Sequence, residues 1–154
     1  MQPSRLAAAL ALAGVLALGG CGSSLDAIHP SPSATPTDFA GVTRSLAERN
    51  LEVSGVVSGD PGCDDAALVP MAISFRLAGP GLDGTVAARI YRFKDAAAYD
   101  RLRTSVDRCA AAWVGDPATM LMVDASPYVL VADGAGESAA ADAIRAALRE
   151  AAGY

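Results

Sequence analysis

Residues 85–113 read TVAARIYRFKDAAAYDRLRTSVDRCAAAW, and this stretch decides the fold. Its first nine residues follow a glycine-rich turn and predict a strand that returns alongside the preceding one. Asp95 comes just before an alanine-rich segment, and its carboxylate can cap a helix that begins at the next residue. The apolar side chains of that helix recur at steps of three and four residues, so they share one face: Tyr99, Leu102, Val106, Cys109 and Trp113.

A second strand is expected on the other side of the glycine-rich turn GPGLDG, which spans residues 79–84. Within a strand expected over about 68–78, large apolar side chains occupy alternate positions, the pattern of a sheet with one covered face: Met71, Ile73, Phe75 and Leu77. Two strands joined by a short glycine-rich turn predict a hairpin. Pro70 has no backbone N–H to offer, so it limits the start of this strand to an edge or an unpaired end.

The segment before the hairpin predicts a helix and a strand. Asp38 can cap a helix that runs to about Arg49, and Asn50 suits the left-handed residue that ends a helix. Residues 51–58 then predict a strand with a bulge at Gly55. Three apolar side chains of that strand are expected on one side: Leu51, Val53 and Val57.

The segment after the central helix predicts two short strands and a last helix. Residues 120–133 fit two strands around DASP, or one bent strand. Ser138 can cap a final helix, which Gly153 closes. The expected order is α-β-β-β-α-β-β-α, in a single α+β domain over 38–154. We expect an antiparallel sheet of about four to five strands with the helices packed on one face.

Composition bounds the function classes. The chain has 154 residues, 52% of them apolar, which suits one domain with a core plus a leader. Its net charge of −5 and the lack of a basic stripe argue against nucleic acid as a partner. The same net negative charge argues against binding to anionic lipid by electrostatic attraction.

The first twenty residues predict a signal for export. The apolar run at 6–18 is uncharged but shorter than the roughly 20 residues that cross a bilayer. It ends in Leu18-Gly19-Gly20-Cys21, which resembles the lipobox of bacterial lipoproteins. That resemblance implies cleavage before Cys21 and transfer of diacylglycerol to its thiol, so residues 1–20 would be removed. In the alternative, the chain is a plain secreted protein and Cys21 is incidental.

We expect residues 21–37 to comprise the lipidated cysteine and a tether rich in serine and proline. Farther along, RIYRF at 89–93 followed by KDAAAYDRL resembles small lipoproteins of GC-rich bacteria. That resemblance implies no particular activity. It agrees with a lipid-anchored protein on the extracytoplasmic side of the cell membrane.

The other two cysteines are expected to pair with each other. Cys63 lies in a turn-rich loop and Cys109 on the apolar face of the central helix. Export places them in an oxidising compartment, where a structural disulfide is typical. The alternative is a redox-active pair, but such pairs usually sit close together as C-x-x-C.

Few residues of the sequence are candidates for catalysis or metal binding. The expected domain has no histidine, so it lacks the commonest general base and zinc ligand. We predict no catalytic residue and no cofactor. Weak candidates for a calcium site are the carboxylates of one loop, Asp60, Asp64 and Asp65. Their spacing matches no EF-hand, and aspartate beside glycine and proline is also ordinary turn chemistry.

One face of the strand expected at 85–93 is a candidate interaction surface. Arg89, Tyr91 and Phe93 share a face of the strand at 85–93, and a basic and aromatic mixture suits an interaction surface. Alternatively, this face is solvated or covered by the first helix. The sequence thus favours a non-enzymatic binding or accessory module of the cell envelope, with an unknown protein or small molecule as its partner. The alternative is a small envelope enzyme that uses carboxylates without histidine.

Overall fold

A computed structural model describes residues 38–136 and 138–154, and these form an α+β domain. The predictions for residues 1–37, which include Cys21 and the tether, lie outside the described residues. Within the described residues the predicted order of elements is confirmed, with five strands in one antiparallel sheet of order β1-β2-β3-β5-β4. The strands are β1 (Glu52–Ser58), β2 (Ala72–Ala78), β3 (Thr85–Arg92), β4 (Leu121–Ala125) and β5 (Tyr128–Ala132). The helices are α1 (Phe39–Ala47), α2 (Ala96–Trp113), α3 (Ala139–Ala152) and the short 3₁₀ helix η1 (Val69–Met71).

The helices begin after their predicted capping residues, whereas α1 ends at Ala47, two residues before the predicted Arg49. The Asp38 carboxylate accepts from the N–H of Gly41 at 3.0 Å, and that of Asp95 accepts from the N–H of Ala98 at 2.7 Å. Asn50 has a φ of 59°, the left-handed conformation expected of it. Ser138 occupies the N-cap position of α3, but its hydroxyl donates backwards to the Ala135 carbonyl instead of capping the helix.

A bulge in β1 changes which of its side chains face the core. The predicted bulge is confirmed at Gly55, where φ is +59° and the pairing with β2 shifts between Ser54 and Val57. The extra residue turns Val57 to the same side as Ser74, and Val57 is 54% exposed. The expectation that Val57 lies on one side with Leu51 and Val53 was therefore wrong.

The second strand begins later than predicted. Regular pairing starts at Ala72, whereas residues 69–71 form η1 with Pro70 inside it. The proline ring fixes φ and removes an N–H, so this segment cannot join the strand ladder.

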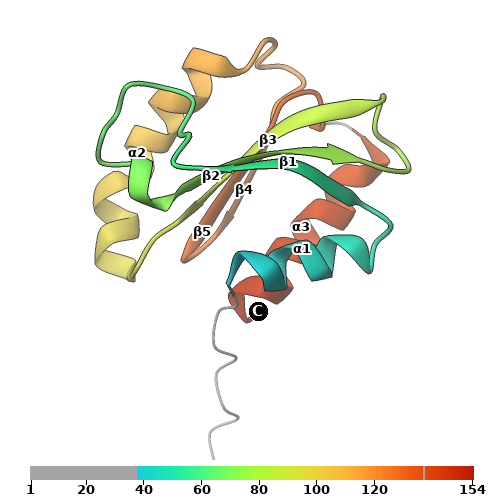
Figure 1. Ribbon diagram of the computed structural model, residues 1–154, viewed down its shortest axis with the longest axis horizontal. Helices are drawn as coiled ribbons and strands as arrows, with labels where there is room; N and C mark the ends of the chain where they lie inside the picture. Colours follow the sequence, from blue (N-terminus) through green and yellow to red (C-terminus); the bar gives the residue numbers. More distant parts are fainter. Residues whose placement is uncertain (1–37, 137) are drawn as a thin grey trace, which may run out of the picture. The chain divides into compact units, whose positions relative to one another are not determined.

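The sheet is covered on both faces, which corrects the expectation of helices on one face. In Figure 1, α1 and α3 lie below the sheet, while α2 and the loop at 59–68 lie above it. The first face, against α1 and α3, carries most of the apolar core: Phe75, Leu77, Val86, Ala88, Ile90, Leu121, Val123, Ala125, Tyr128, Leu130 and Ala132. These side chains pack on Val42, Leu46, Ile144 and Leu148 of the two helices.

The second face carries a smaller core under α2. Tyr91, Val129 and Val131 point to this side because neighbouring strand residues alternate between faces. They pack with Leu68, Phe93, Ala98, Val106, Cys109 and Ala110. The crossover from β3 to β4 therefore carries α2 over the face opposite to α1 and α3.

Candidate functional site

A disulfide ties the loop at 59–68 to α2. Cys63 bonds to Cys109 across a sequence separation of 46 residues, with their Cα atoms 5.2 Å apart. The predicted structural pairing of these two cysteines is confirmed. Because Cys109 lies on the buried face of α2, the bond holds the loop against the second face of the sheet.

Arg89 lies beneath this loop and joins three elements. Its Nη2 donates to Asp60 Oδ2 at 3.0 Å, and its guanidinium carbon lies 4.3 Å from the centroid of the Trp113 ring. Gly62 makes room for this arrangement. A Cβ at Gly62 would lie 2.4 Å from Trp113 Cδ1 and 2.7 Å from Arg89 Nε. The loop can therefore close over Arg89 only with glycine at position 62.

Tyr91 and Phe93 are buried, so they do not form an open binding face. The Tyr91 hydroxyl donates to the Pro61 carbonyl at 2.7 Å, and the Phe93 ring packs edge-on against Tyr99 at 5.3 Å. Burial raises the pKa of Tyr91 to about 12, against the opposing effects of Trp113 and the Arg89 charge. Sequence reasoning placed these residues on one face correctly but did not foresee that α2 and the disulfide-bonded loop cover that face.

Two of the three loop aspartates accept hydrogen bonds from the loop backbone. Asp60 Oδ1 accepts from the N–H of Gly62, and Asp65 Oδ1 accepts from the N–H of Ala67, each at 3.0 Å. Asp65 also lies 3.9 Å from Arg108. Asp64 belongs to the same loop. Within residues 38–136 and 138–154, no three acidic, cysteine or histidine side chains come together as a metal site.

The carboxylate of Asp60 is held in its ionised form. Partial burial acts to raise its pKa. Hydrogen bonds from Ser74 and from the Gly62 backbone, together with the Arg89 charge, outweigh that effect and hold the pKa below its ordinary value. At neutral pH this group is therefore an anion paired with a cation and has no proton to give.

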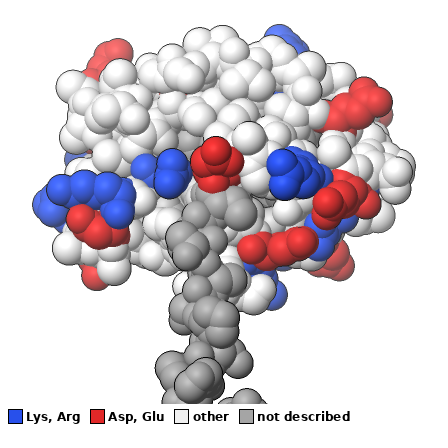
Figure 2. All heavy atoms as spheres, turned by 60° about the horizontal axis from the view of Figure 1, so that its bottom comes forward, with Lys and Arg blue, Asp and Glu red and all other residues white. Residues whose placement is uncertain are grey.

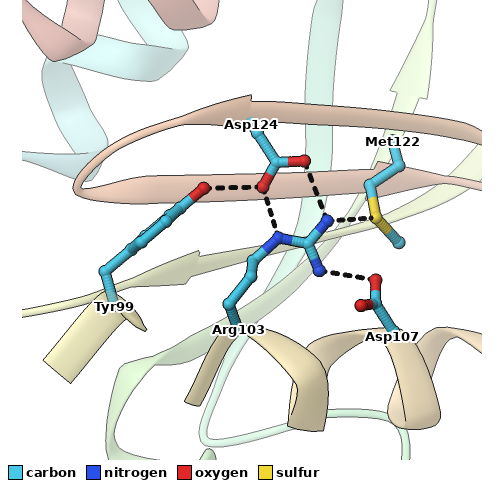
Figure 3. A network of polar contacts seen from close by, with 5 residues as sticks. All are labelled: Tyr99, Arg103, Asp107, Met122 and Asp124. Carbon is cyan, nitrogen blue, oxygen red and sulfur yellow. Dashed lines mark hydrogen bonds and ion pairs between the residues drawn. The ribbon is translucent and has the colours of Figure 1, made fainter. Parts of the chain in front are cut away.

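A second polar cluster, which sequence reasoning missed, connects α2 with the edge strand β4 (Figure 3). Arg103 forms a bidentate ion pair with Asp124, in which Nη2 donates to Oδ2 at 2.8 Å and Nε donates to Oδ1. Its third nitrogen donates to Asp107, one turn farther along the helix. The Tyr99 hydroxyl donates to Asp124 Oδ1 at 2.8 Å. We call these four residues the Arg103 network.

Contacts within the Arg103 network shift the pKa values of three of its residues, Asp124, Tyr99 and Arg103. The hydrogen bond from Arg103 is the largest influence on Asp124 and lowers its pKa, although burial opposes it. Burial, followed by the hydrogen bond to Asp124, raises the pKa of Tyr99 to about 12. Bonding to Asp124 also raises the pKa of Arg103. The network is therefore a charge-paired clamp between a helix and a strand at neutral pH. One signal in the sequence was available, since Tyr99, Arg103 and Asp107 are spaced by four residues.

Two hollows lie beside these clusters. One, of about 510 Å³, lies next to the Arg103 network and is lined by Tyr99, Asp124, Ser126, Arg149 and Tyr154. The other, of about 230 Å³, lies on the second face where α2 does not reach; we call it the arginine hollow. Its lining includes Gly55, Asp60, Ser74, Arg76, Ala87 and Arg89. Arg89 is thus the one predicted binding residue that borders this hollow.

Charges are interspersed on another part of the surface. Figure 2 shows basic and acidic side chains side by side around the lower part of the domain. Two ion pairs involve α3: Arg49 with Glu150 at 2.7 Å, and Arg145 with Asp142 at 2.9 Å. This face therefore presents a mixture of charges.

Searches of protein family models, curated proteins and solved structures find no match to this chain. None of the helices within the described residues is long and apolar enough to cross a bilayer. The function is therefore inferred from the residues themselves.

Proposed function

We propose that this chain is an extracytoplasmic lipoprotein, anchored in the cell membrane through lipid on Cys21. Its domain would serve as a non-enzymatic binding or accessory module of the cell envelope. One observation carries the proposal. The chain has three cysteines, and the Cys63–Cys109 disulfide uses two of them, which leaves Cys21. A disulfide of this kind is typical of exported proteins, and lipid attachment gives the remaining cysteine a role.

The residues before Cys21 support this assignment chemically. A thiol is a strong nucleophile and forms a stable thioether with lipid. Gly19 and Gly20 let the backbone lie extended in a narrow peptidase cleft. After removal of residues 1–20, the tether at 22–37 could reach about 50 Å at roughly 3.1 Å per residue. That length would hold the domain clear of the lipid headgroups.

The strength of the anchor would come from its acyl chains. Each buried methylene contributes about 0.8 kcal/mol, so one chain holds marginally and two hold stably. A diacylglycerol on Cys21 supplies two chains. The face seen in Figure 2 mixes basic and acidic side chains, which agrees with an anchor that does not depend on a basic patch there.

A binding role is favoured over the alternative of a carboxylate enzyme. General acid catalysis needs a carboxyl group whose pKa is raised toward the working pH. Asp60 and Asp124 have lowered pKa values: hydrogen bonds from Ser74 and the Gly62 backbone, with Arg89, lower that of Asp60, and the hydrogen bond from Arg103 lowers that of Asp124. Each of the two hollows contains one of these carboxylates, so neither presents a pair.

Labelling of cells with radioactive palmitate tests the anchor. The chain with Cys21→Ala is expected to lose the label and to leave the membrane fraction. Ser23→Ala, two residues away, is the matched control and should keep both properties. Label that persists in the Cys21→Ala chain would sink the proposal, as would release of the control.

A further inference from the structure

The open part of the second face places two arginines together. Antiparallel pairing sets Ser74 of β2 opposite Arg89 of β3, and Arg76 opposite Ala87. Paired residues point to the same side of a sheet, and residues two apart on one strand do the same. Arg76, Ser74 and Arg89 therefore lie as neighbours on the face that α2 leaves partly uncovered.

Small residues shape the arginine hollow around these side chains. Ala87 is exposed and offers only a methyl group beside Arg76. Gly55, at the bulge of β1, adds no side chain on the opposite flank, and a Cβ there would lie 3.8 Å from Arg76 Cδ. The hollow has a volume of about 230 Å³, which is enough for a small ionic group and its hydration.

The positive charge in this hollow exceeds the negative. Arg76 is exposed and forms no hydrogen bond or ion pair with any residue in the described part of the chain. Arg89 gives Nη2 to Asp60, while its buried Nε finds no partner there. Asp60 is the only carboxylate among the lining residues, so the lining holds two arginines and one carboxylate.

We propose that the arginine hollow binds the oxyanion of a small ligand, a carboxylate or a phosphate, between Arg76 and Arg89. Guanidinium groups match both anions because their planar donors form two parallel hydrogen bonds. The Ser74 hydroxyl donates to Asp60 and so helps to hold that carboxylate beside Arg89. This inference rests on the proposed binding role and names the ligand chemistry that the domain would recognise.

Asp60 acts in this site as a positioning residue. Its two oxygens are occupied by the Gly62 N–H at 3.0 Å and by Arg89 Nη2 at 3.0 Å. It therefore holds the Arg89 guanidinium at the rim of the hollow. The disulfide two positions beyond Pro61 keeps this loop in place. The disulfide-bonded loop therefore positions Arg89, and the arginine hollow itself lies on the part of the second face that α2 does not cover.

Nuclear magnetic resonance on the full chain in detergent micelles tests the inference. Sodium phosphate and, separately, sodium acetate are added at constant ionic strength while the arginine Nε–H signals are followed. We expect saturable shifts at Arg76 and Arg89 with at least one of the two anions. The anion that saturates at lower concentration identifies the oxyanion class.

Two substitutions and one control separate a site from general charge screening. Arg76→Gln removes one guanidinium, and we expect it to weaken binding by about tenfold or more. Ala87→Leu fills the hollow without altering charge and should also abolish the saturable shifts. Arg101→Gln removes another exposed arginine, on α2, and should leave them unchanged.

The inference is overturned if neither anion gives saturable shifts at Arg76 and Arg89. Equal weakening by Arg76→Gln and Arg101→Gln would overturn it as well, because it would indicate screening alone. Anchoring is scored by palmitate label on Cys21, whereas anion binding is scored on the purified chain. Either proposal can therefore fail without the other.

Discussion

The two faces of the sheet are covered by different means. On the first face, α1 and α3 bury large aliphatic side chains such as Leu46, Ile144 and Leu148 against the strands. On the second face, the residues that α2 buries are mostly small: Ala98, Ser105, Val106, Cys109 and Ala110. There the cover is supplemented by a disulfide, a cation–π contact and the Arg103 network. The first face is held by apolar burial, and the second by specific bonds.

This difference bears on where function resides. A face sealed by apolar packing has no polar groups to offer a ligand. On the second face, α2 and the loop at 59–68 cover only part of the sheet. Arg89 and Arg76 lie where this cover ends, beside the arginine hollow. The candidate site therefore lies on the face with the smaller core.

The largest expected effect is loss of the disulfide. Replacing Cys63 by Ser and Cys109 by Ala should lower the free energy of unfolding by about 4 kcal/mol, because the bond closes a long loop in the unfolded chain. Denaturant unfolding of the full chain measures this. Cys21→Ala is the matched cysteine control and should leave stability unchanged. A loss below about 1 kcal/mol in the double variant would contradict the role given to the bond.

Truncation in the two cores compares the faces directly. Leu148→Ala on the first face should cost about 3 kcal/mol, through lost burial and a cavity. Val106→Ala on the second face removes two methyl groups and should cost about 2 kcal/mol. The same unfolding experiment ranks them. The reverse order would mean that the second face carries more of the stability than its smaller core indicates.

Gly62→Ala tests the closure of the loop over Arg89. Gly62 has a φ of +79°, and its Cβ would meet Trp113 and Arg89. We expect a loss of about 2 kcal/mol from strain and displacement together. Gly84→Ala is a matched control, since its φ is +75° and nothing lies within 4 Å of its Cβ. An equal cost at Gly84 and Gly62 would show that backbone strain alone accounts for the effect.

The smallest expected effect concerns the acidic groups paired with arginine. The pKa of Asp124 is lowered in the folded chain, so its contribution is present above its ordinary pKa of 3.8. That contribution is lost as pH falls through the lower folded value. Asp124 is 44% exposed in its side chain, so we expect less than about 1 kcal/mol at pH 7.

Thermal unfolding of the wild type and Asp124→Asn across this pH range measures that contribution. The two melting temperatures should differ at pH 7 and converge in strong acid. A difference that grows as pH falls would reverse the sign of the linkage. Asp142→Asn is a suitable control, since Asp142 forms an exposed ion pair on α3.

The sequence alone determined most of the local structure. Asp38 and Asp95 cap helix starts because their carboxylates accept from backbone N–H groups three residues on. Asn50 after α1 and Gly55 at the bulge adopt the left-handed conformation that these residue types favour. The pairing of Cys63 with Cys109 followed from the cysteine count and the expected compartment. These inferences need only neighbouring residues or chain-wide counts.

Only the tertiary structure decided which face each helix covers and what remained open. The apolar stripe of α2 could pack on either face of the sheet. The periodicity of its apolar residues does not show that α2 crosses to the face opposite α3. That placement buried Tyr91 and Phe93 and left Arg89 at the border with Arg76. It also brought Asp124 of β4 to Arg103 of α2. Local preferences act over a few residues, whereas these contacts join elements that meet only when the whole core packs.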